Sequence, residues 1–203
     1  MENLNTIDNV RRMLARGAAE KSSDFDLNAD RSSPFPNASA LRQAAVLVPL
    51  IERSGGLNVI LTKRASHLKH HPGQIAFPGG KVEDFDKNEI ATALREADEE
   101  TGLSPDNVDV LGRMPFHETV THFQIAPVVG QVKMPFSPRP EPGEVAEVFE
   151  VPLAHLTDLN NYLVEGRHWG GSMRHYYVVP YGPYYIWGAT ARILRGFAER
   201  LST

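Results

Sequence analysis

Four acidic residues crowd into five positions of one segment, ALREADEETGL at 93–103, whose pattern predicts the end of a helix. They are Glu96, Asp98, Glu99 and Glu100. Like charges three or four residues apart on a helix repel each other by about 0.2–0.5 kcal/mol per pair. The C-terminal end of a helix also carries partial negative charge of its own. A fold that ends a helix here therefore needs something to offset this charge.

Three of these acids share one face of the expected helix. At about 100° per residue, Glu96, Glu99 and Glu100 fall within an arc of about 100°. This arc lies beside an apolar stripe formed by Ala93, Leu94 and Ala97. Three converging carboxylates are the hard oxygen ligands that Mg²⁺ or Mn²⁺ prefers. A solvated acidic face is the competing interpretation, and this stretch alone favours neither. Gly79 and Gly80 precede the helix and let the backbone approach a ligand closely, which favours a metal site.

The composition narrows the class of protein. With 203 residues, 41% apolar and 23% charged, the chain fits one soluble globular domain, or a domain with an extra arm. A net charge of −4 gives no reason to expect binding to nucleic acid or to an anionic membrane. The absence of cysteine excludes disulfides, thiolate metal sites and a cysteine nucleophile. The longest apolar run, 44–51, is too short to cross a bilayer, and the N-terminus lacks the apolar core of a signal peptide. We therefore expect a cytoplasmic protein.

Strand and helix patterns along the chain predict an α/β fold. The expected strands are 44–52 and 57–64, paired as a hairpin, then 108–114, 123–132, 145–153, 174–180 and 184–188. The expected helices are 86–102, a short one after Pro152, and 189–201. For the first helix, Asp86 is the expected N-cap and Gly102 the C-terminal stop. Residues 65–80 are expected to form a loop. These elements predict a mixed β-sheet between helices, an α/β sandwich.

The first forty residues form an arm. Residues 5–17 have apolar positions at helical spacing, which predicts a short amphipathic helix packed on the body, or a helix that binds a partner. Residues 21–40 are rich in Ser, Asp, Asn and Pro, which predicts a loop or tether. The body is expected to run from Leu41 to the C-terminus, 41–203. The arm could also pack across a homodimer.

The acidic segment and the glycines before it resemble the Nudix box, G-x5-E-x7-R-E-U-x-E-E-x-G-U, where U is a bulky aliphatic residue. Gly80 is followed by five residues and then by Asp86, and eight residues later the chain reads READEETGL, 95–103. Asp86 replaces the glutamate of the pattern, the second gap is one residue longer, and Ala97 is small for U. The first two departures put a metal role for Asp86 in doubt, but they do not touch the REUxEE core. The resemblance implies a Nudix-type α/β/α sandwich with a mixed sheet.

The resemblance also implies roles for residues of the box. Glu96, Glu99 and Glu100 would hold Mg²⁺ or Mn²⁺, with the carbonyl of Gly79 as a further ligand. Arg95 would orient a glutamate, since it can reach Glu99 one helical turn later. The alternative for Arg95 is an ordinary surface ion pair, which contributes little.

A second segment, ILTKRASHLKHHPGQIAFPGG at 60–80, resembles the signature of the coenzyme A pyrophosphatase branch, L-[VIL]-T-x-R-[SA]-x3-R-x3-G-x3-F-P-G-G. Lys69 stands where this signature has arginine, which keeps the charge and loses the two-pronged donor. The resemblance implies hydrolysis of the pyrophosphate in coenzyme A or its derivatives, to 3′,5′-ADP and 4′-phosphopantetheine or its acyl form. Coenzyme A carries a separate 3′-phosphate, so we expect substrate contacts from Arg64 and Lys69 first, beside Gly79 and Gly80. Other cations and histidines of this loop can be solvated or packing groups.

The implied reaction needs a proton acceptor for the attacking water. Inside the box Glu99 is a candidate. Outside it, the segment 140–153 starts with Pro and Gly, typical of a loop that folds over a site, and offers Glu144 first and Glu147 second. A solvent-facing position on an edge strand is an equally good interpretation of both.

Two other functions stay open. The chain could be a Nudix hydrolase of another nucleoside diphosphate derivative, such as ADP-ribose, against which the 60–80 signature argues. It could also be a catalytically silent module that binds a nucleotide or a protein. The presence of all three box glutamates argues against silence. In either enzymatic case the partner is a small-molecule substrate.

Overall fold

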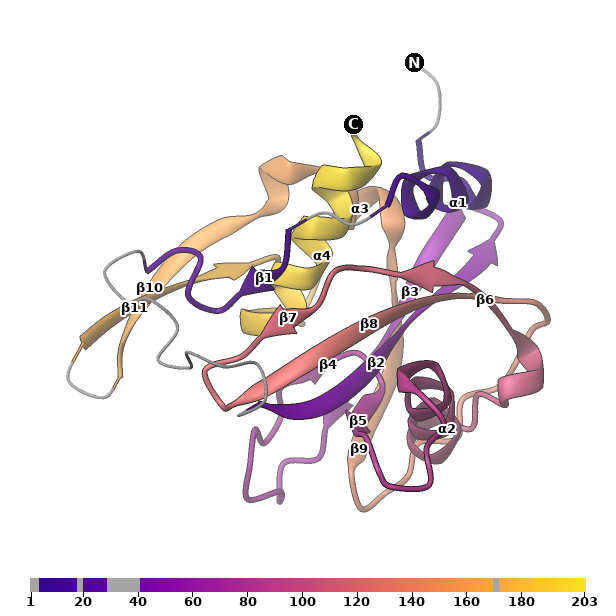
Figure 1. Cartoon of the computed structure of the whole chain (residues 1–203), viewed down its shortest axis with the longest axis horizontal. Coiled ribbons are helices and arrows are strands. Elements are labelled where there is room, and N and C mark those ends of the chain that lie inside the picture. Colours follow the sequence, from indigo (N-terminus) through magenta and orange to yellow (C-terminus); the bar gives the residue numbers. More distant parts are fainter. Residues whose placement is uncertain (1–3, 18–19, 29–40, 170–171) are drawn as a thin grey trace.

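The strand β2 (Arg42–Arg53) organises the sheet, and its apolar run is long because both faces of the strand are covered. It pairs in parallel with β8 (Phe123–Val132) and antiparallel with β3 (Gly56–Arg64) and β5 (Gly79–Lys81). The computed structural model describes residues 4–17, 20–28, 41–169 and 172–203. In these residues nine strands form one mixed sheet, with the helices arranged on its two faces (Figure 1). The predicted hairpin and the predicted strands at 108–114, 123–132 and 145–153 are confirmed.

The other elements complete an α/β sandwich. The remaining strands of the sheet are β1 (Ser22–Ser23), β4 (Ile75–Ala76), β6 (Val108–Arg113), β7 (His117–Glu118) and β9 (Val145–Pro152). The α-helices are α1 (Ile7–Ala15), α2 (Glu89–Thr101), α3 (Leu153–Thr157) and α4 (Gly188–Leu201). β10 (Leu163–Trp169) and β11 (Ser172–Val178) form a separate antiparallel hairpin beside α4 (Figure 1). In the described residues no helix is both long and apolar enough to cross a membrane.

Two apolar clusters hold the three layers together. One lies between the sheet and α2, where Ala93 and Ala97 of the helix pack against Leu47 and Ile60. The other cluster lies on the opposite face of the sheet. There, apolar residues of α1, α3 and α4 pack with apolar residues of β2 and β3. In the first cluster, Ala93, Ala97, Leu47 and Ile60 are each at most 1% exposed. Burial of these stripes places α2 alone on one face, with its acidic end at the margin of the sheet.

The helix α2 begins later than the sequence pattern predicts. Its N-cap is Asn88, whose side chain accepts a hydrogen bond from the Ala91 N–H at 3.0 Å, so the assignment of Asp86 as N-cap is wrong. Asp86 instead accepts hydrogen bonds from Thr92 and from Arg95. The helix ends as predicted at Gly102, which has φ +74°, a conformation that suits glycine at this position.

Two further predictions were wrong, and one strand was missed. Residues 65–80 are not a continuous loop, since they contain β4 and the start of β5. Residues 184–188 are not a strand, because a tight turn between Tyr181 and Tyr184 leads almost directly into α4. β10 was not predicted, since residues 163–168 are all exposed or half-buried and their sequence has no regular alternation of apolar and polar residues.

The N-terminal arm follows the body closely where it is described. α1 buries Val10 and Met13 and lies against β6 and α4. Residues 20–28, called here the N-terminal strap, contain β1, which pairs in parallel with β7. The predicted tether at 21–40 is therefore partly a strand, and its portion 29–40 lies outside the described residues.

Candidate active site

Two glycines bring the backbone of β5 against β2 and α2. The N–H of Gly79 donates a hydrogen bond of 3.1 Å to Glu100 Oε2. A Cβ on Gly79 would lie 2.5 Å from the carbonyl oxygen of Ala45, and a Cβ on Gly80 would lie 2.6 Å from Glu96 Oε2. A side chain at position 79 would therefore collide with the backbone of β2, and one at position 80 would displace the carboxylate of Glu96. The carboxylates of α2 therefore rest directly on the Gly79-Gly80 backbone.

Glu100 is a buried carboxyl group, with 5% of the residue exposed. Its pKa is raised to about 8, chiefly because the group is buried and also because Glu96 and Glu144 lie near it, although the Gly79 N–H and the charge of Arg64 act in the opposite direction. Burial also raises the pKa of Glu96, with smaller contributions from Glu99 and Glu144. Two carboxyl groups thus share a poorly hydrated place, which is favourable only with a proton or a cation between them.

Arg95 organises the acids around it. Its guanidinium donates to Asp86 at 2.9 and 3.0 Å, to Glu96 at 2.9 Å and to Glu99 at 3.0 Å. The predicted contact with Glu99 is present. Arg95 also reaches the carbonyl of Lys81 at 3.3 Å. Since one side chain bonds to three carboxylates, it fixes their positions relative to β5.

The three box glutamates do not all converge as predicted. Glu96 and Glu100 lie together, but the side chain of Glu99 is 60% exposed. Arg95 Nη1 bonds to both Glu96 and Glu99 and holds Glu99 at the surface. Within the described part of the chain, no three acidic or histidine side chains are already grouped tightly enough to enclose a metal ion. The oxygen donors, the buried carboxyl pair and the glycine backbone against them nevertheless fit a divalent cation. Glu99 would join such a site by leaving Arg95.

The loop before β9 covers the end of α2. The N–H of Glu141 bonds to the carbonyl of Glu100 at 3.1 Å, and the N–H of Ala65 bonds to the carbonyl of Glu144 at 2.8 Å. Glu144 is exposed, yet its charge raises the pKa of both Glu96 and Glu100, which places its carboxylate near theirs. The loop thus brings one additional carboxylate to the site.

Glu147 does not belong to this group. Its side chain accepts a hydrogen bond of 2.6 Å from the hydroxyl of Tyr184, which raises the pKa of Tyr184 to about 12. Tyr184 stacks on Phe149, part of the core on the α4 side of the sheet. Glu147 therefore faces away from the box glutamates, and Glu144 is the better placed of the two.

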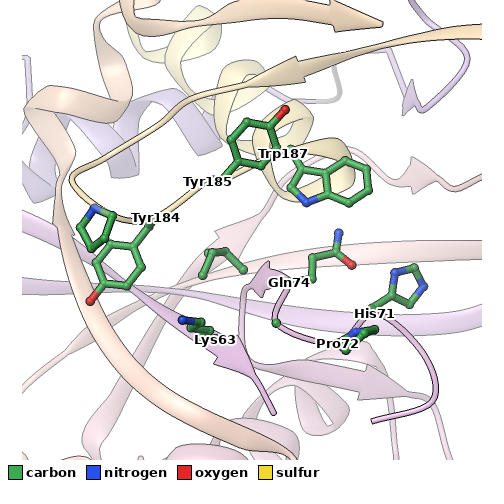
Figure 2. A pocket seen from close by; sticks show the side chains of 10 residues that line it. Lys63, His71, Pro72, Gln74, Tyr184, Tyr185 and Trp187 are labelled. Carbon is green, nitrogen blue, oxygen red and sulfur yellow. The ribbon is translucent and has the colours of Figure 1, made fainter. Parts of the chain in front are cut away.

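Neighbouring cations on β3 point to opposite faces of the sheet. Arg64 lies near Glu100, whose pKa its charge lowers, and its buried Nε has no hydrogen-bond partner in the described residues. Lys63 lines a pocket of about 400 Å³ on the other face, with Tyr184 near it and His71 and Trp187 further along (Figure 2). Of the two, Arg64 belongs to the carboxylate site.

A larger cavity of about 690 Å³, called here the hairpin cavity, lies on the α4 side of the sheet. The loop after β3, the N-terminal strap, the β10–β11 hairpin and the start of α4 all contribute to its wall. Lys69 is one of its lining residues, together with His70 and His71. The pattern at 60–80 singled out Lys69, but nothing in the sequence indicated that Arg167, Arg174 or the strap would join it.

Comparison with known proteins identifies the fold around this site. A family model described as the NUDIX domain matches residues 41–169. The chain belongs to the Nudix hydrolase family. It is similar to a Cronobacter sakazakii protein called an uncharacterized Nudix hydrolase NudL, with 45% identity over 160 residues, 79% of this chain and 83% of the relative. The protein of that name from Escherichia coli strain K12 is 42% identical over 160 residues, with the same coverage of both chains.

Among solved structures, the chain is similar to the Nudix hydrolase RenU of M. smegmatis, with 23% identity and a TM-score of 0.48 over 58% of this chain and 74% of that one. Because the chain is a Nudix hydrolase, the segment 80–103 is its Nudix box. In this Nudix box the helix starts after Asp86, and the residue that replaces the usual glutamate is bonded to the box arginine, Arg95.

Proposed function

We propose that this Nudix hydrolase cleaves the pyrophosphate bond of coenzyme A or a coenzyme A derivative, giving 3′,5′-ADP and 4′-phosphopantetheine or its acyl form. One observation carries the proposal. The segment 60–80, which resembles the coenzyme A branch, has Arg64 near Glu100 and Lys69 in the wall of the hairpin cavity. These two cations would contact the reacting pyrophosphate and a more distant part of an extended substrate.

Glu96, Glu99 and Glu100 would hold Mg²⁺ or Mn²⁺, with the Gly79 carbonyl as a further ligand. A bound divalent cation neutralises pyrophosphate charge and makes water a stronger nucleophile. Arg95 would hold Glu96 in place and release Glu99 when the metal enters. The raised pKa of Glu100 supports this assignment, because a carboxylate that is costly to ionise alone is stabilised by a cation beside it.

The chain's own groups would handle charge and proton. Arg64 would donate hydrogen bonds to a phosphate oxygen through its guanidinium, whose buried Nε has no partner in the described residues. Glu144 would accept the proton of the attacking water, since its carboxylate is near the box glutamates and stays exposed. Glu99 is the alternative acceptor, although Arg95 holds its carboxylate in an ion pair in this structure. Water adds to one phosphorus atom, the bridging P–O bond breaks, and the other half leaves as a phosphate.

The test is product analysis with the full chain and Mg²⁺ or Mn²⁺. Coenzyme A and ADP-ribose are supplied separately, and the products are separated by chromatography and identified by mass. We expect 3′,5′-ADP and 4′-phosphopantetheine from coenzyme A, and loss of both in Glu100→Gln. Faster cleavage of ADP-ribose would assign the chain to another Nudix substrate. Metal binding without turnover of either compound would identify a silent module.

A further inference from the structure

Two arginines face each other across the β10–β11 hairpin. Arg167 of β10 is the direct antiparallel partner of Arg174 of β11. Residues in this relation project from the same face of the hairpin, and like charges directly opposite each other are destabilising. Both arginines line the hairpin cavity. The hairpin thus directs a pair of mutually repelling cations towards one enclosed space.

The acids Asp24 and Asp26 line the cavity, and both have other partners. Asp24 of the N-terminal strap bonds to His117 at 3.1 Å and to the N–H of Val120 at 3.0 Å. Asp26 forms an ion pair of 2.7 Å with Arg192. In the described residues no carboxylate forms an ion pair with Arg167 within 4.0 Å. In these parts of the chain, no ion pair therefore offsets the charge that Arg167 brings to the cavity wall.

Aromatic rings lie next to the arginine pair. Tyr176 and Trp187 are in tilted contact, with ring centroids 5.2 Å apart, and both line the cavity with Phe77 and Phe123. Aromatic rings of this kind bind the flat face of a nucleobase. A cavity of about 690 Å³ is within the usual range for small-molecule sites. Cations beside aromatic rings suit a nucleoside that carries a phosphate.

The loop between β3 and β5 connects this cavity to the carboxylates. Its first end, at Arg64, and its last, at Gly79, both lie at Glu100. The cavity is lined by Lys69, His70, His71 and Gln74 from the middle of the loop, and then by Ala76 and Phe77. A substrate whose pyrophosphate lies at the ends of this loop can extend along it into the cavity.

We propose that Arg167 and Arg174 form a clamp for a phosphate on the ribose of the substrate, outside the pyrophosphate, while the base lies against Tyr176 and Trp187. This inference rests on the proposed function and deepens it, because it assigns the 3′-phosphoadenosine half of coenzyme A to the hairpin cavity. It makes the two arginines determinants of specificity for a 3′-phosphorylated nucleotide. The anion relieves the repulsion between the arginines, so binding stabilises the hairpin.

The first measurement is binding without turnover. Calorimetry compares 3′,5′-ADP with 5′-AMP on the full chain, and the parent is expected to prefer 3′,5′-ADP by about tenfold to a hundredfold, the usual value of hydrogen bonds to a charged group. Arg167→Gln and Arg174→Gln should each remove most of this preference. Arg167→Lys should retain part of it. Lys133→Gln, which removes an exposed cation at the end of β8, is the matched control and should leave the preference unchanged.

A second readout separates the clamp from a loss of folding. Thermal unfolding of ligand-free Arg167→Gln should occur at the same temperature as the parent or slightly higher, because the cross-strand repulsion is gone. 3′,5′-ADP should raise the unfolding temperature of the parent and not of Arg167→Gln. Equal affinity of the parent for 3′,5′-ADP and 5′-AMP would overturn the clamp.

Kinetics with coenzyme A and 3′-dephospho-coenzyme A distinguish this inference from the proposed function. If both are cleaved equally well and Arg167→Gln changes neither, the clamp is wrong and the hydrolase assignment stands. If Arg167→Gln weakens both equally, the arginines contact the pyrophosphate and the clamp is also wrong. If neither compound is cleaved but the preference for 3′,5′-ADP is lost in Arg167→Gln, the proposed function fails and the clamp stands.

Discussion

Arg95 bonds to Asp86 at two points, from Nε to Oδ1 at 3.0 Å and from Nη2 to Oδ2 at 2.9 Å. The side chain of Asp86 is only 4% exposed, and Thr92 donates a further hydrogen bond to it. This residue occupies the position where the box pattern has glutamate, one residue further from the arginine. Because both oxygens of Asp86 are engaged in holding Arg95, its part in the site is to position the arginine that positions Glu96 and Glu99.

Asp86→Asn should lower the free energy of unfolding by about 1–3 kcal/mol at neutral pH, because Arg95 loses its charged partner. The Arg95 hydrogen bonds hold the pKa of Asp86 well below its ordinary value of 3.8. The stabilisation is therefore present above that value and is lost as pH falls through the acidic range. Urea unfolding at several pH values measures this effect. Asp84→Asn, at an exposed position, is the control, and an equal loss there would refute the role of Asp86.

Glu100→Gln should stabilise the protein when divalent ions are absent. The pKa of Glu100 is about 8 in the folded chain and 4.5 ordinarily, so the folded state binds more protons between these values and the parent loses stability as pH rises through them. The glutamine variant lacks this loss. Added Mg²⁺ should reverse the order, since it stabilises only the parent. Thermal unfolding with EDTA or Mg²⁺ measures both effects.

Turnover by Glu100→Gln should fall at least about a hundredfold, since a metal ligand contributes several kcal/mol of charge stabilisation in the transition state. Asp98→Asn removes an exposed acid from the same helix and should retain activity. Similar losses of turnover in the two variants would show that the general acidity of the helix matters and not the buried ligand.

The two glycines of β5 should respond differently to alanine. In Gly80→Ala the new Cβ meets the carboxylate of Glu96, the far end of a flexible side chain, so folding changes little and metal binding weakens. In Gly79→Ala it meets the backbone of Ala45 and Val46, which should cost about 1–3 kcal/mol of stability. Chemical denaturation and calorimetry with Mn²⁺ separate the effects. Gly55→Ala, with open space around it, is the control. Unchanged Mn²⁺ affinity in Gly80→Ala would rule out Glu96 as a ligand.

Arg64→Gln should lower kcat/KM by about tenfold to a hundredfold, as expected for the loss of a charged hydrogen bond to a phosphate. Lys63→Gln removes the neighbouring positive charge, which lies near Tyr184 in the smaller pocket (Figure 2), and serves as the matched control. Steady-state kinetics of the two variants under one set of conditions decide the matter. If the lysine variant is impaired as much as the arginine variant, a diffuse positive field and not a directed contact binds the substrate.

The sequence predicted the strands that are buried on both faces and the helices that bury one face at regular intervals. The β2–β3 hairpin, β8, β9 and α2 follow from long apolar runs or a helical stripe, because burial forces such patterns. Residues 184–188 were mistaken for a strand, since Tyr184, Tyr185 and Ile186 favour strands locally, but only isolated bridges form there before α4 begins. β10 has little buried surface, so its sequence carries no comparable pattern.

The carboxylate site was partly predictable for a similar reason. Glu96 and Glu100 are one helical turn apart, so periodicity alone brings them together. Glu99 was expected to join them, but Arg95 bonds to it in this structure. The hairpin cavity depends on tertiary contacts that no local pattern contains. Asn28 of the strap, for example, bonds to His175, 147 residues later.

The pairing of β1 with β7 has a consequence for synthesis of the chain. Ser22 bonds to the buried ring of His117, 95 residues further on, and this pair lies at the margin of the sheet. The strap leaves the ribosome long before the strand on which it rests. It can take its place only after that strand has been translated, so this wall of the hairpin cavity cannot form while the strap alone has been made.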